Sequence, residues 1–318
     1  MSHEFAYLTQ SGFLGAPLGP GLHPYAVAGI AFDGATTNRP GARFGPAAIR
    51  AASHMLCDAE HNLWDCSPRE VLTDYGDLPT PNTSLADMRL ALERLALPIA
   101  MQHHTCWLGG DHSVTLSLLR VYREIFRLPL ALIHFDAHCD TWTSHCGEPS
   151  GHGTWVYEAL EEGLIIPAAT IQIGLRSPGP REARDYVRSL GGSIHDARSL
   201  RGLTRPAELQ PLIADIRERV AAAGHPPLYL SLDIDCLDPA FAPGTGTPEP
   251  AGLSSSQMAT ILEGLLDLPF VGMDCVEVAP AYDHAQLTSQ VAAYLVWTYL
   301  CARIARGDGR FPPHRAAR

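Results

Sequence analysis

The sequence predicts an α/β protein, a three-layer α/β/α sandwich in which helices cover both faces of a mostly parallel central sheet. Short β-branched and apolar runs alternate along the chain with longer stretches of helical period, which is typical of a parallel sheet. The 318 residues are 46% hydrophobic and 18% charged, which supplies a large core and argues against disorder over most of the chain. We therefore expect one domain built around one sheet.

Each strand is predicted from a short apolar run rich in β-branched or aromatic residues. The predicted strands are Ala26 to Phe32, Val71 to Asp74, Thr105 to Leu108, Leu130 to Phe135, Thr170 to Ile173, Leu228 to Leu232 and Val271 to Val276. Each helix is predicted from a longer stretch in which apolar residues recur with a period near 3.6. The predicted helices are Pro46 to Ser53, Leu85 to Leu95, Val114 to Phe126, Thr154 to Glu162, Arg181 to Leu190, Ala207 to Ala223, Ser255 to Leu266 and Gln290 to Ile304.

No composition shift divides the chain, so we expect a single domain over residues 1–318. Residues 1–24, rich in Gly and Pro, are predicted to form an N-terminal arm over the surface, and residues 307–318 a flexible tail. Two long segments without a strong period, Asp136 to Gly153 and Asp233 to Gly252, begin where strands end. Such loops are usually functional, and ligands of parallel sheets bind at the carboxyl ends of strands.

Charge and composition exclude several functions. The net charge is −11 and no basic run occurs, which argues against nucleic-acid and anionic-membrane partners. All 23 basic residues are Arg, so lysine-dependent chemistry such as Schiff-base formation is excluded. The eight Cys residues contain no Cys-x-x-Cys pair, the first residues lack a basic region followed by an apolar stretch, and no apolar run of spanning length occurs. We expect a cytoplasmic protein with reduced thiols.

The first chemical signal is Asp136-Ala137-His138-Cys139-Asp140, which directly follows the predicted strand Leu130 to Phe135. In an extended segment residues i, i+2 and i+4 share a face. Asp136, His138 and Asp140 are therefore predicted to point toward one place.

Two further clusters follow other strands. Asp233 and Asp235 come after the strand Leu228 to Leu232 and again share a face if extended. His112 follows Gly109-Gly110, where the glycines permit a tight turn toward the same sheet edge. A lone Asp here could instead cap a helix or form a turn, and a lone His could be a core residue. Three clusters on three strand ends favour a shared metal site.

The ligand types indicate two metal ions and hydrolysis. Four carboxylates in one small volume repel each other unless they are counter-charged, and the chain has no Lys. Carboxylates with two imidazoles suit manganese (Mn²⁺), with Ni²⁺, Co²⁺ or Fe²⁺ as competitors, and disfavour a thiolate zinc site. Two such ions about 3.5 to 4 Å apart would share a water and convert it to hydroxide near neutral pH.

These segments together resemble the ureohydrolases, the arginase and agmatinase family, and the agmatinase and guanidinobutyrase branch most closely. The resemblance rests on Gly109-Gly110-Asp111-His112-Ser113, the Asp136 to Asp140 motif, the run Ser231 to Pro248, and Asp274 to Asp283. It extends from about Ala28 to Arg303. It implies the arginase-like form of the predicted sandwich and a homo-oligomer, trimeric or hexameric.

The resemblance also implies roles for individual residues. Two Mn²⁺ per subunit would be held by His112, Asp136, His138, Asp140, Asp233 and Asp235, with Asp136 and Asp233 bridging the ions. A metal-bridging hydroxide would attack the guanidinium carbon, Asp140 would steady it and relay a proton, and His152 would assist proton transfer and contact the substrate. Glu277 would bind the substrate guanidinium, whose planar fork a carboxylate can accept through two hydrogen bonds.

The implied reaction is cleavage of a small guanidino compound, of the agmatine or 4-guanidinobutyrate type, to urea and an amine. Within the loop Thr141 to Ser150, Glu148 could favour an ammonium tail, whereas Arg39 or Arg43 could supply a cation for a carboxylate tail. Small guanidines or biguanides remain alternative substrates, and a non-catalytic assembly subunit of the same fold is an alternative function.

Overall fold

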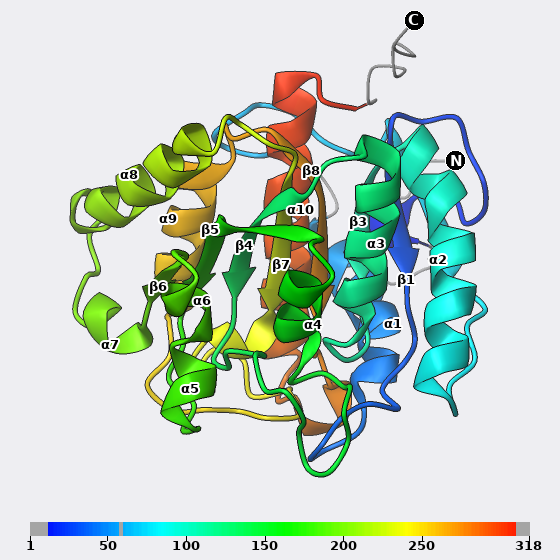
Figure 1. The fold of residues 1–318 in the computed structure, drawn as a ribbon. Helices are drawn as coiled ribbons and strands as arrows, with labels where there is room; N and C mark the ends of the chain where they lie inside the picture. Colours follow the sequence, from blue (N-terminus) through cyan, green and yellow to red (C-terminus); the bar gives the residue numbers. More distant parts are fainter. Residues whose placement is uncertain (1–11, 57–59, 310–318) are drawn as a thin grey trace, which may run out of the picture.

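Eight parallel strands form one central sheet in the computed structural model, which describes residues 12–56 and 60–309 (Figure 1). Their order across the sheet is β2-β1-β3-β8-β7-β4-β5-β6. The strands are β1 (Tyr25–Gly29), β2 (Leu72–Asp77), β3 (His104–Leu108), β4 (Leu130–Phe135), β5 (Ile165–Ile173), β6 (Ser193–His195), β7 (Leu228–Asp233) and β8 (Phe270–Val276). The predicted parallel sheet is confirmed.

Helices cover both faces of the sheet, as predicted (Figure 1). One apolar cluster packs the sheet against α1 (Gly45–Ser53), α8 (Pro206–Ala222), α9 (Ser255–Leu265) and α10 (Leu287–Arg306). A second cluster packs the opposite face against α2 (Leu85–Gln102), α3 (Val114–Phe126) and α4 (Trp155–Glu161). The short helices α5 (Arg181–Arg184), α6 (Tyr186–Ser189) and α7 (Ala197–Leu200) lie near β5 and β6 at one edge.

The strands become polar on one face as they approach their carboxyl ends. Ile133 and Phe135 of β4 and Leu232 of β7 belong to the apolar cluster under α8, α9 and α10. Because successive side chains of a strand alternate between faces, His134 and Asp233 lie on the other face, toward α3 and α4. This change from apolar to polar side chains places potential ligand residues at the carboxyl ends of the strands.

Several elements differ from the prediction. Helix α2 continues through Pro98 to Gln102, because Ile99 and Ala100 are buried and extend its apolar stripe. The helix predicted over 181–190 is divided at Asp185 into α5 and α6. Strand β6 and helix α7 were not predicted, since elements of three or four residues are too short to show a period.

The predicted terminal segments are described in part. Residues 1–11 of the arm and 310–318 of the tail lie outside the described residues. Phe13 and Leu14 are buried against the core of the α1 face. Among the described residues, no helix combines the length and the apolar character needed to span a lipid bilayer.

Candidate metal centre and active site

The central strands β3, β8, β7 and β4 are neighbours, and each ends at the same edge. The turn after β3 passes so close to the loop after β1 that a Cβ on Gly110 would lie 1.7 Å from the Phe32 carbonyl oxygen. Only glycine fits there. This close turn directs His112 into the site between β3 and α3, as predicted.

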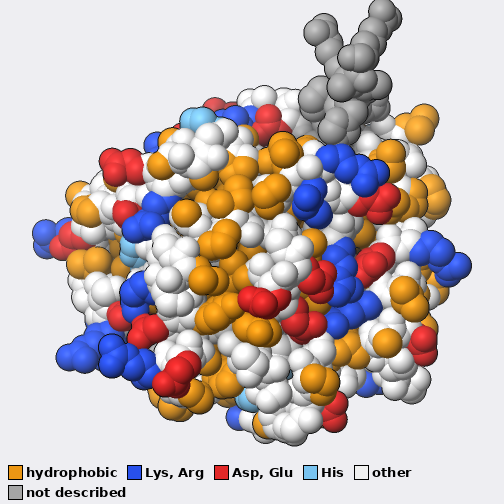
Figure 2. Space-filling model, viewed as in Figure 1, with side chains coloured by type: hydrophobic (Ala, Val, Ile, Leu, Met, Phe, Trp, Pro, Cys, Tyr) orange, Lys and Arg blue, Asp and Glu red, His pale blue; other side chains and the backbone are white. Residues whose placement is uncertain are grey.

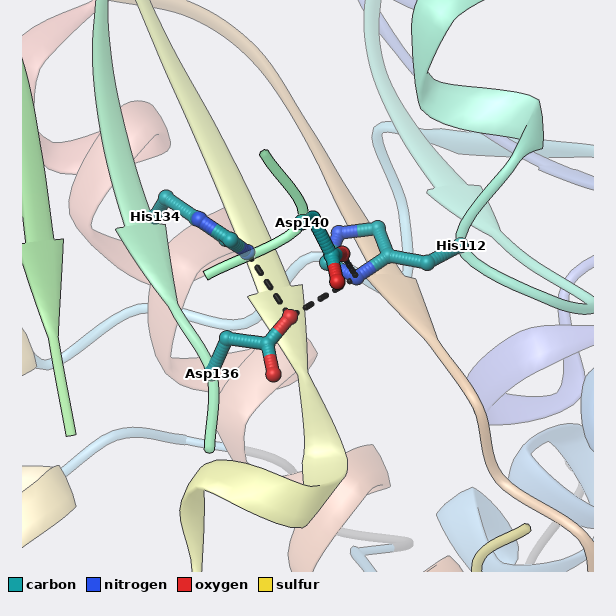
Figure 3. Close-up of side chains that lie close together, drawn as sticks. All are labelled: His112, His134, Asp136 and Asp140. Carbon is teal, nitrogen blue, oxygen red and sulfur yellow. Dashed lines mark hydrogen bonds and ion pairs between the residues drawn. The ribbon is translucent and has the colours of Figure 1, made fainter. Parts of the chain in front are cut away.

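His112 is fully buried and faces three carboxylates, of which Figure 3 draws those of Asp136 and Asp140. Its Nδ1 lies 3.0 Å from Asp136 Oδ2 and 3.0 Å from Asp233 Oδ2. The distance from Nδ1 to Asp140 Oδ2 is 3.2 Å. Side chains from three separate strand ends therefore meet at one nitrogen atom.

The hydrogen bonds behind His112 define its tautomer. Ser231 Oγ donates its only proton to Asp274 Oδ1 at 2.7 Å. The Ser231 oxygen can therefore only accept a hydrogen bond from His112 Nε2, which lies 2.8 Å away. In the neutral ring Nδ1 then carries the lone pair. Burial disfavours the imidazolium, but Asp136, Asp140 and Asp233 raise the pKa of His112 well above its usual range, so Nδ1 is placed to bind a cation, either a proton or a metal ion. A lone pair that faces three carboxylate oxygens is the arrangement of a cation site.

A second group of ligand atoms surrounds His138. Its Nδ1 lies 3.2 Å from Asp136 Oδ1 and 3.1 Å from Asp235 Oδ2. Asp235 Oδ1 also accepts the backbone N–H of Ala137 at 3.0 Å, which joins the β7 end to the β4 end. Asp136 thus presents one oxygen to each histidine and lies between the two groups.

The donor set fits two divalent cations. Asp136, Asp140, Asp233 and Asp235 carry four formal negative charges and are at most 4% exposed. Burial, together with the charges of Asp235 and Asp136, raises the pKa of Asp233 well above its usual range. Buried carboxylates at such density are normally paired or bound to metal, and two divalent ions balance four carboxylates.

The convergence of Asp136, His138 and Asp140 was predicted, but the extended backbone assumed for it is wrong. The chain leaves the strand conformation after Phe135, and Asp140 adopts a φ of 52°. The Asp140 carbonyl accepts the backbone N–H of Val156 at 3.0 Å, and its Oδ2 accepts Trp155 Nε1–H at 2.7 Å. Helix α4 therefore holds Asp140 in place.

His152 and Glu277 form a buried pair beside the carboxylates. Glu277 Oε1 lies 3.0 Å from His152 Nδ1 and accepts the backbone N–H of His112 at 2.9 Å. The Thr37 backbone N–H donates to His152 Nε2 at 3.1 Å, which places the proton of the neutral ring on Nδ1. Burial disfavours the imidazolium, but Glu277 and the nearby Asp111 and Asp140 raise the pKa of His152 to about 9.

Glu277 keeps one oxygen for a ligand. Its Oε2 is buried and has no hydrogen-bond partner among the described residues. A carboxylate oxygen without a donor is costly in a protein interior. The arrangement suits a cationic, donor-rich group such as a guanidinium.

A cavity of about 280 Å³ opens beside the ligand cluster and His152, and Glu277 is not among its lining residues. His112, His138, Asp140 and Asp233 form part of its wall, so the ligand cluster is accessible to a small molecule. The remaining lining residues are Thr37, Asn38, Arg39, Trp142, His145, His152, Gly153, Ser177, Pro178, Thr247, Pro248 and Glu249.

The sequence model of the Arginase family matches residues 23–302. The chain belongs to the arginase family. The matched range includes all eight strands described above and all six candidate ligands. The family membership predicted from the motifs is confirmed.

Relatives of this arginase-family chain align with it over most of its length. The agmatinases of Chromobacterium violaceum and of an Enterobacter species are each 40% identical to it, over 282 and 306 residues. The first match covers 87% of this chain and 82% of the relative, and the second covers 93% and 94%. At these coverages the similarity concerns whole proteins.

Solved structures confirm the arginase-like fold of this family member. A hypothetical agmatinase from Burkholderia thailandensis matches with a TM-score of 0.86 at 37% identity, covering 96% of this chain and 94% of that one. Proclavaminate amidino hydrolase from Streptomyces clavuligerus matches with a TM-score of 0.84 at 34% identity, covering 95% and 99%.

Sequence reasoning missed several residues of this arginase-family site. His134 Nε2 lies 2.8 Å from Asp136 Oδ2, close enough to hold that carboxylate or to join a ligand group (Figure 3). The signal was present, because His134 precedes Asp136 by two residues and shares its face. No local sequence signal links Ser231 and Trp155 to the ligands they contact.

Two of the charged residues considered for substrate selection do not line the cavity. Glu148 is exposed and lies in a turn in which the backbones of His145 and Glu148 exchange hydrogen bonds. Arg43 pairs with Asp33. Arg39 does line the cavity, and so does Glu249, which sequence reasoning did not single out.

Proposed function

We propose that this chain is a ureohydrolase, which cleaves the C–N bond of a small guanidino compound, a linear amidine, to give urea and an amine. The observation that carries the proposal is the lone pair of His112 Nδ1 directed at three carboxylate oxygens, beside the His152–Glu277 pair. The agmatinase names of the relatives support the same reaction class.

The proposed cofactor is a pair of Mn²⁺ ions, with Ni²⁺ or Co²⁺ as alternatives. When bound, the two ions supply a hydroxide nucleophile near neutral pH. The proposed ligands are His112, Asp136, His138, Asp140, Asp233 and Asp235. Their oxygen-rich composition favours a hard ion over a thiolate-bound one.

The other site residues would bind the substrate and move protons. Glu277 Oε2 would accept a guanidinium N–H, since this oxygen lacks a partner among the described residues. Asp140 Oδ2 is occupied by Trp155, so Oδ1 would carry a proton to the leaving amine. His152 Nε2 would exchange protons at the cavity wall, where Thr37 now occupies it through its N–H and its hydroxyl.

The substrate tail would meet two opposite charges. Glu249 Oε1 accepts Ser177 Oγ–H at 2.9 Å and lies 3.9 Å from His138 Nε2. The Arg39 guanidinium lies over the Tyr282 ring, 5.1 Å from its centroid. Glu249 would favour the ammonium tail of agmatine, and Arg39 the carboxylate tail of 4-guanidinobutyrate. The named agmatinases favour the first.

We also propose, from the family resemblance, a cytoplasmic homo-oligomer, a trimer or a hexamer, that folds as a single domain over residues 1–318. Light scattering of the purified protein measures the assembly directly.

The deciding experiment is urea release after removal of metal and separate reconstitution with Mn²⁺, Ni²⁺ and Co²⁺. The panel contains agmatine, 4-guanidinobutyrate, arginine, guanidine and a biguanide, and elemental analysis accompanies each rate. We expect two ions per chain and one strongly preferred substrate. Two bound ions without urea from any substrate would refute the proposal and favour a non-catalytic assembly subunit.

Two variants then identify the residue that recognises the charged tail of the substrate. Glu249→Gln should raise KM for an ammonium-tailed substrate about tenfold or more, and Arg39→Gln should do the same for a carboxylate-tailed one. Each variant serves as the control for the other. Equal effects of both variants on both tails would place tail recognition elsewhere.

A further inference from the structure

A second cavity, of about 350 Å³, lies on the other side of the metal-ligand loop, near β5 and β6. It is formed by the segment after β5 together with α5, α6 and α7. Figure 2 shows basic side chains gathered at the lower left of the view, over α7 of Figure 1. The lining residues are Ala137, Cys139, Leu175, Arg176, Ser177, Arg184, Asp185, Arg188, Ile194, Asp196, Arg198 and Arg201.

The cavity is basic in an acidic protein. Five of its lining residues are Arg and two are Asp, whereas the whole chain carries a net charge of −11. A local excess of positive charge on such a chain is not explained by composition. Cationic clefts of this kind concentrate anions, because the low-dielectric walls focus the field into the cavity.

The two carboxylates of the cavity are already occupied. Asp185 pairs with Arg188 and, through Oδ2, with Arg181 at 3.3 Å. Asp196 caps α7 by accepting the Ser199 backbone N–H at 2.7 Å. Neither carboxylate forms an ion pair with Arg198 or Arg201 in the described chain.

The arginines of the cavity differ in whether their guanidinium N–H groups already make hydrogen bonds. Arg176 donates to a set of backbone carbonyls that includes Asp235, Leu237 and Glu249, so its role is to hold the loop after β7. The guanidinium groups of Arg198 and Arg201, by contrast, are exposed and make no hydrogen bond or ion pair with the described residues. Their donors are free to bind a ligand.

The floor of the cavity is the back of the metal-ligand loop. Ala137 and Cys139 alternate with Asp136, His138 and Asp140 along the chain, and they face the opposite way. The Ala137 carbonyl also accepts the backbone N–H groups of Arg176 and Ser177 at 2.8 and 3.0 Å. The cavity and the ligand cluster thus share one loop.

We propose that this cavity binds a small multivalent oxyanion, carrying phosphate or carboxylate groups, through Arg198 and Arg201. Planar guanidinium groups bind both kinds of oxyanion through paired N–H donors. The cavity volume admits a molecule of a few heavy atoms, and the apolar side chains of Leu175 and Ile194 in its wall can contact a short carbon chain. Ser177 lines both cavities, but Arg198 and Arg201 line only this one, and the site does not depend on the proposed reaction.

The test is isothermal titration calorimetry of the metal-loaded full chain with inorganic phosphate and with succinate, at constant ionic strength. The double variant Arg198→Gln, Arg201→Gln removes the free donors. The matched control, Arg94→Gln, Arg123→Gln, removes the same charge from α2 and α3 on the molecular surface. We expect at least one probe to bind the wild type and the control, and to bind the double variant at least tenfold more weakly.

Three results would overturn the proposal. The first is the absence of saturable binding of either probe up to 10 mM, on the order of the weakest affinity that calorimetry resolves. The second is unchanged binding by the double variant, which would place the anion at the metal centre. The third is a change in oligomeric state of the double variant in light scattering, which would make these arginines contacts between copies of the chain. Preference for phosphate or for succinate identifies the chemical source of the ligand.

Discussion

Asp233→Asn should have opposite effects on metal-free and metal-loaded protein. Asp233 is 3% exposed, and burial together with Asp235 and Asp136 raises the pKa of its carboxyl well above the usual range. Once the pH exceeds that raised pKa, folding costs about 1.4 kcal/mol for every pH unit that separates the raised pKa from the ordinary one. The neutral amide removes this cost, so the chelated variant should be more stable than the chelated wild type at pH 8.

The same substitution should greatly weaken metal binding. One unit of charge removed about 4 Å from a unit cation is worth about 4 kcal/mol at an effective dielectric of 20, which is roughly a thousandfold in affinity. Urea release should then fall to background. Urea denaturation with and without EDTA measures the first effect, and elemental analysis after dialysis measures the second.

Asp238→Asn is the matched control for this experiment. Asp238 lies in the same segment, but its oxygens accept the backbone N–H groups of Ala240 and Gly252 rather than facing the ligand cluster. We expect it to retain two ions. An Asp233→Asn protein that keeps two ions and near-normal turnover, or that is destabilised in EDTA as strongly as in metal, would refute the assignment of Asp233 as a ligand.

Three further predictions concern substrate capture, proton relay and pH. Glu277→Gln should lower kcat/KM by a factor of about 100 or more with two ions still bound, because the guanidinium loses its charged acceptor. Trp155→Phe keeps the ring but removes the hydrogen bond to Asp140, and should lower kcat about tenfold with little change in KM. Burial and the charge of Arg303 lower the pKa of His104 to about 3, so the unfolded chain binds a proton below pH 6.5 that the folded chain does not. Between pH 7 and pH 5 this residue should therefore cost about 2 kcal/mol of stability, a loss that His104→Gln should not show.

A specific result would contradict each of these three predictions. Unchanged kcat/KM in Glu277→Gln would place the guanidinium acceptor elsewhere. A Trp155→Phe effect confined to KM would mean that the indole shapes the cavity and does not orient Asp140. Parallel pH profiles of stability for His104→Gln and the wild type, both measured in EDTA, would show that His104 is protonated in the folded state.

The sequence predicted most of the fold and the ligand cluster because the same physical signal marks both. Apolar runs define strands, and the abrupt change to Asp and His at their carboxyl ends marks a common edge. His134 was missed because a histidine inside an apolar strand is usually a core residue, and only the neighbouring Asp136 distinguishes it. The positive φ of Asp140 was missed because residue spacing does not define the backbone path.

The cavity wall was harder to predict than the ligands. Glu148 was considered because it lies in the loop after β4, but Cys146 and Gly147 turn the chain with φ angles of 51° and 87° and leave Glu148 in solvent. Glu249 reaches the wall from the loop after β7, far along the chain. Which side chains line a cavity depends on turn geometry and long-range packing, which local sequence patterns do not reveal.

Two residues with proposed chemical roles, Asp140 and Glu277, adopt left-handed backbone conformations, with φ angles of 52° and 64°. L-residues avoid this region at a cost of roughly 1 to 2 kcal/mol each, and glycine does not. Backbone strain alone would therefore favour glycine at both positions. The strained residues are retained for their carboxylates, which accept hydrogen bonds from Trp155 Nε1–H and the His112 backbone N–H and also serve the proposed chemistry.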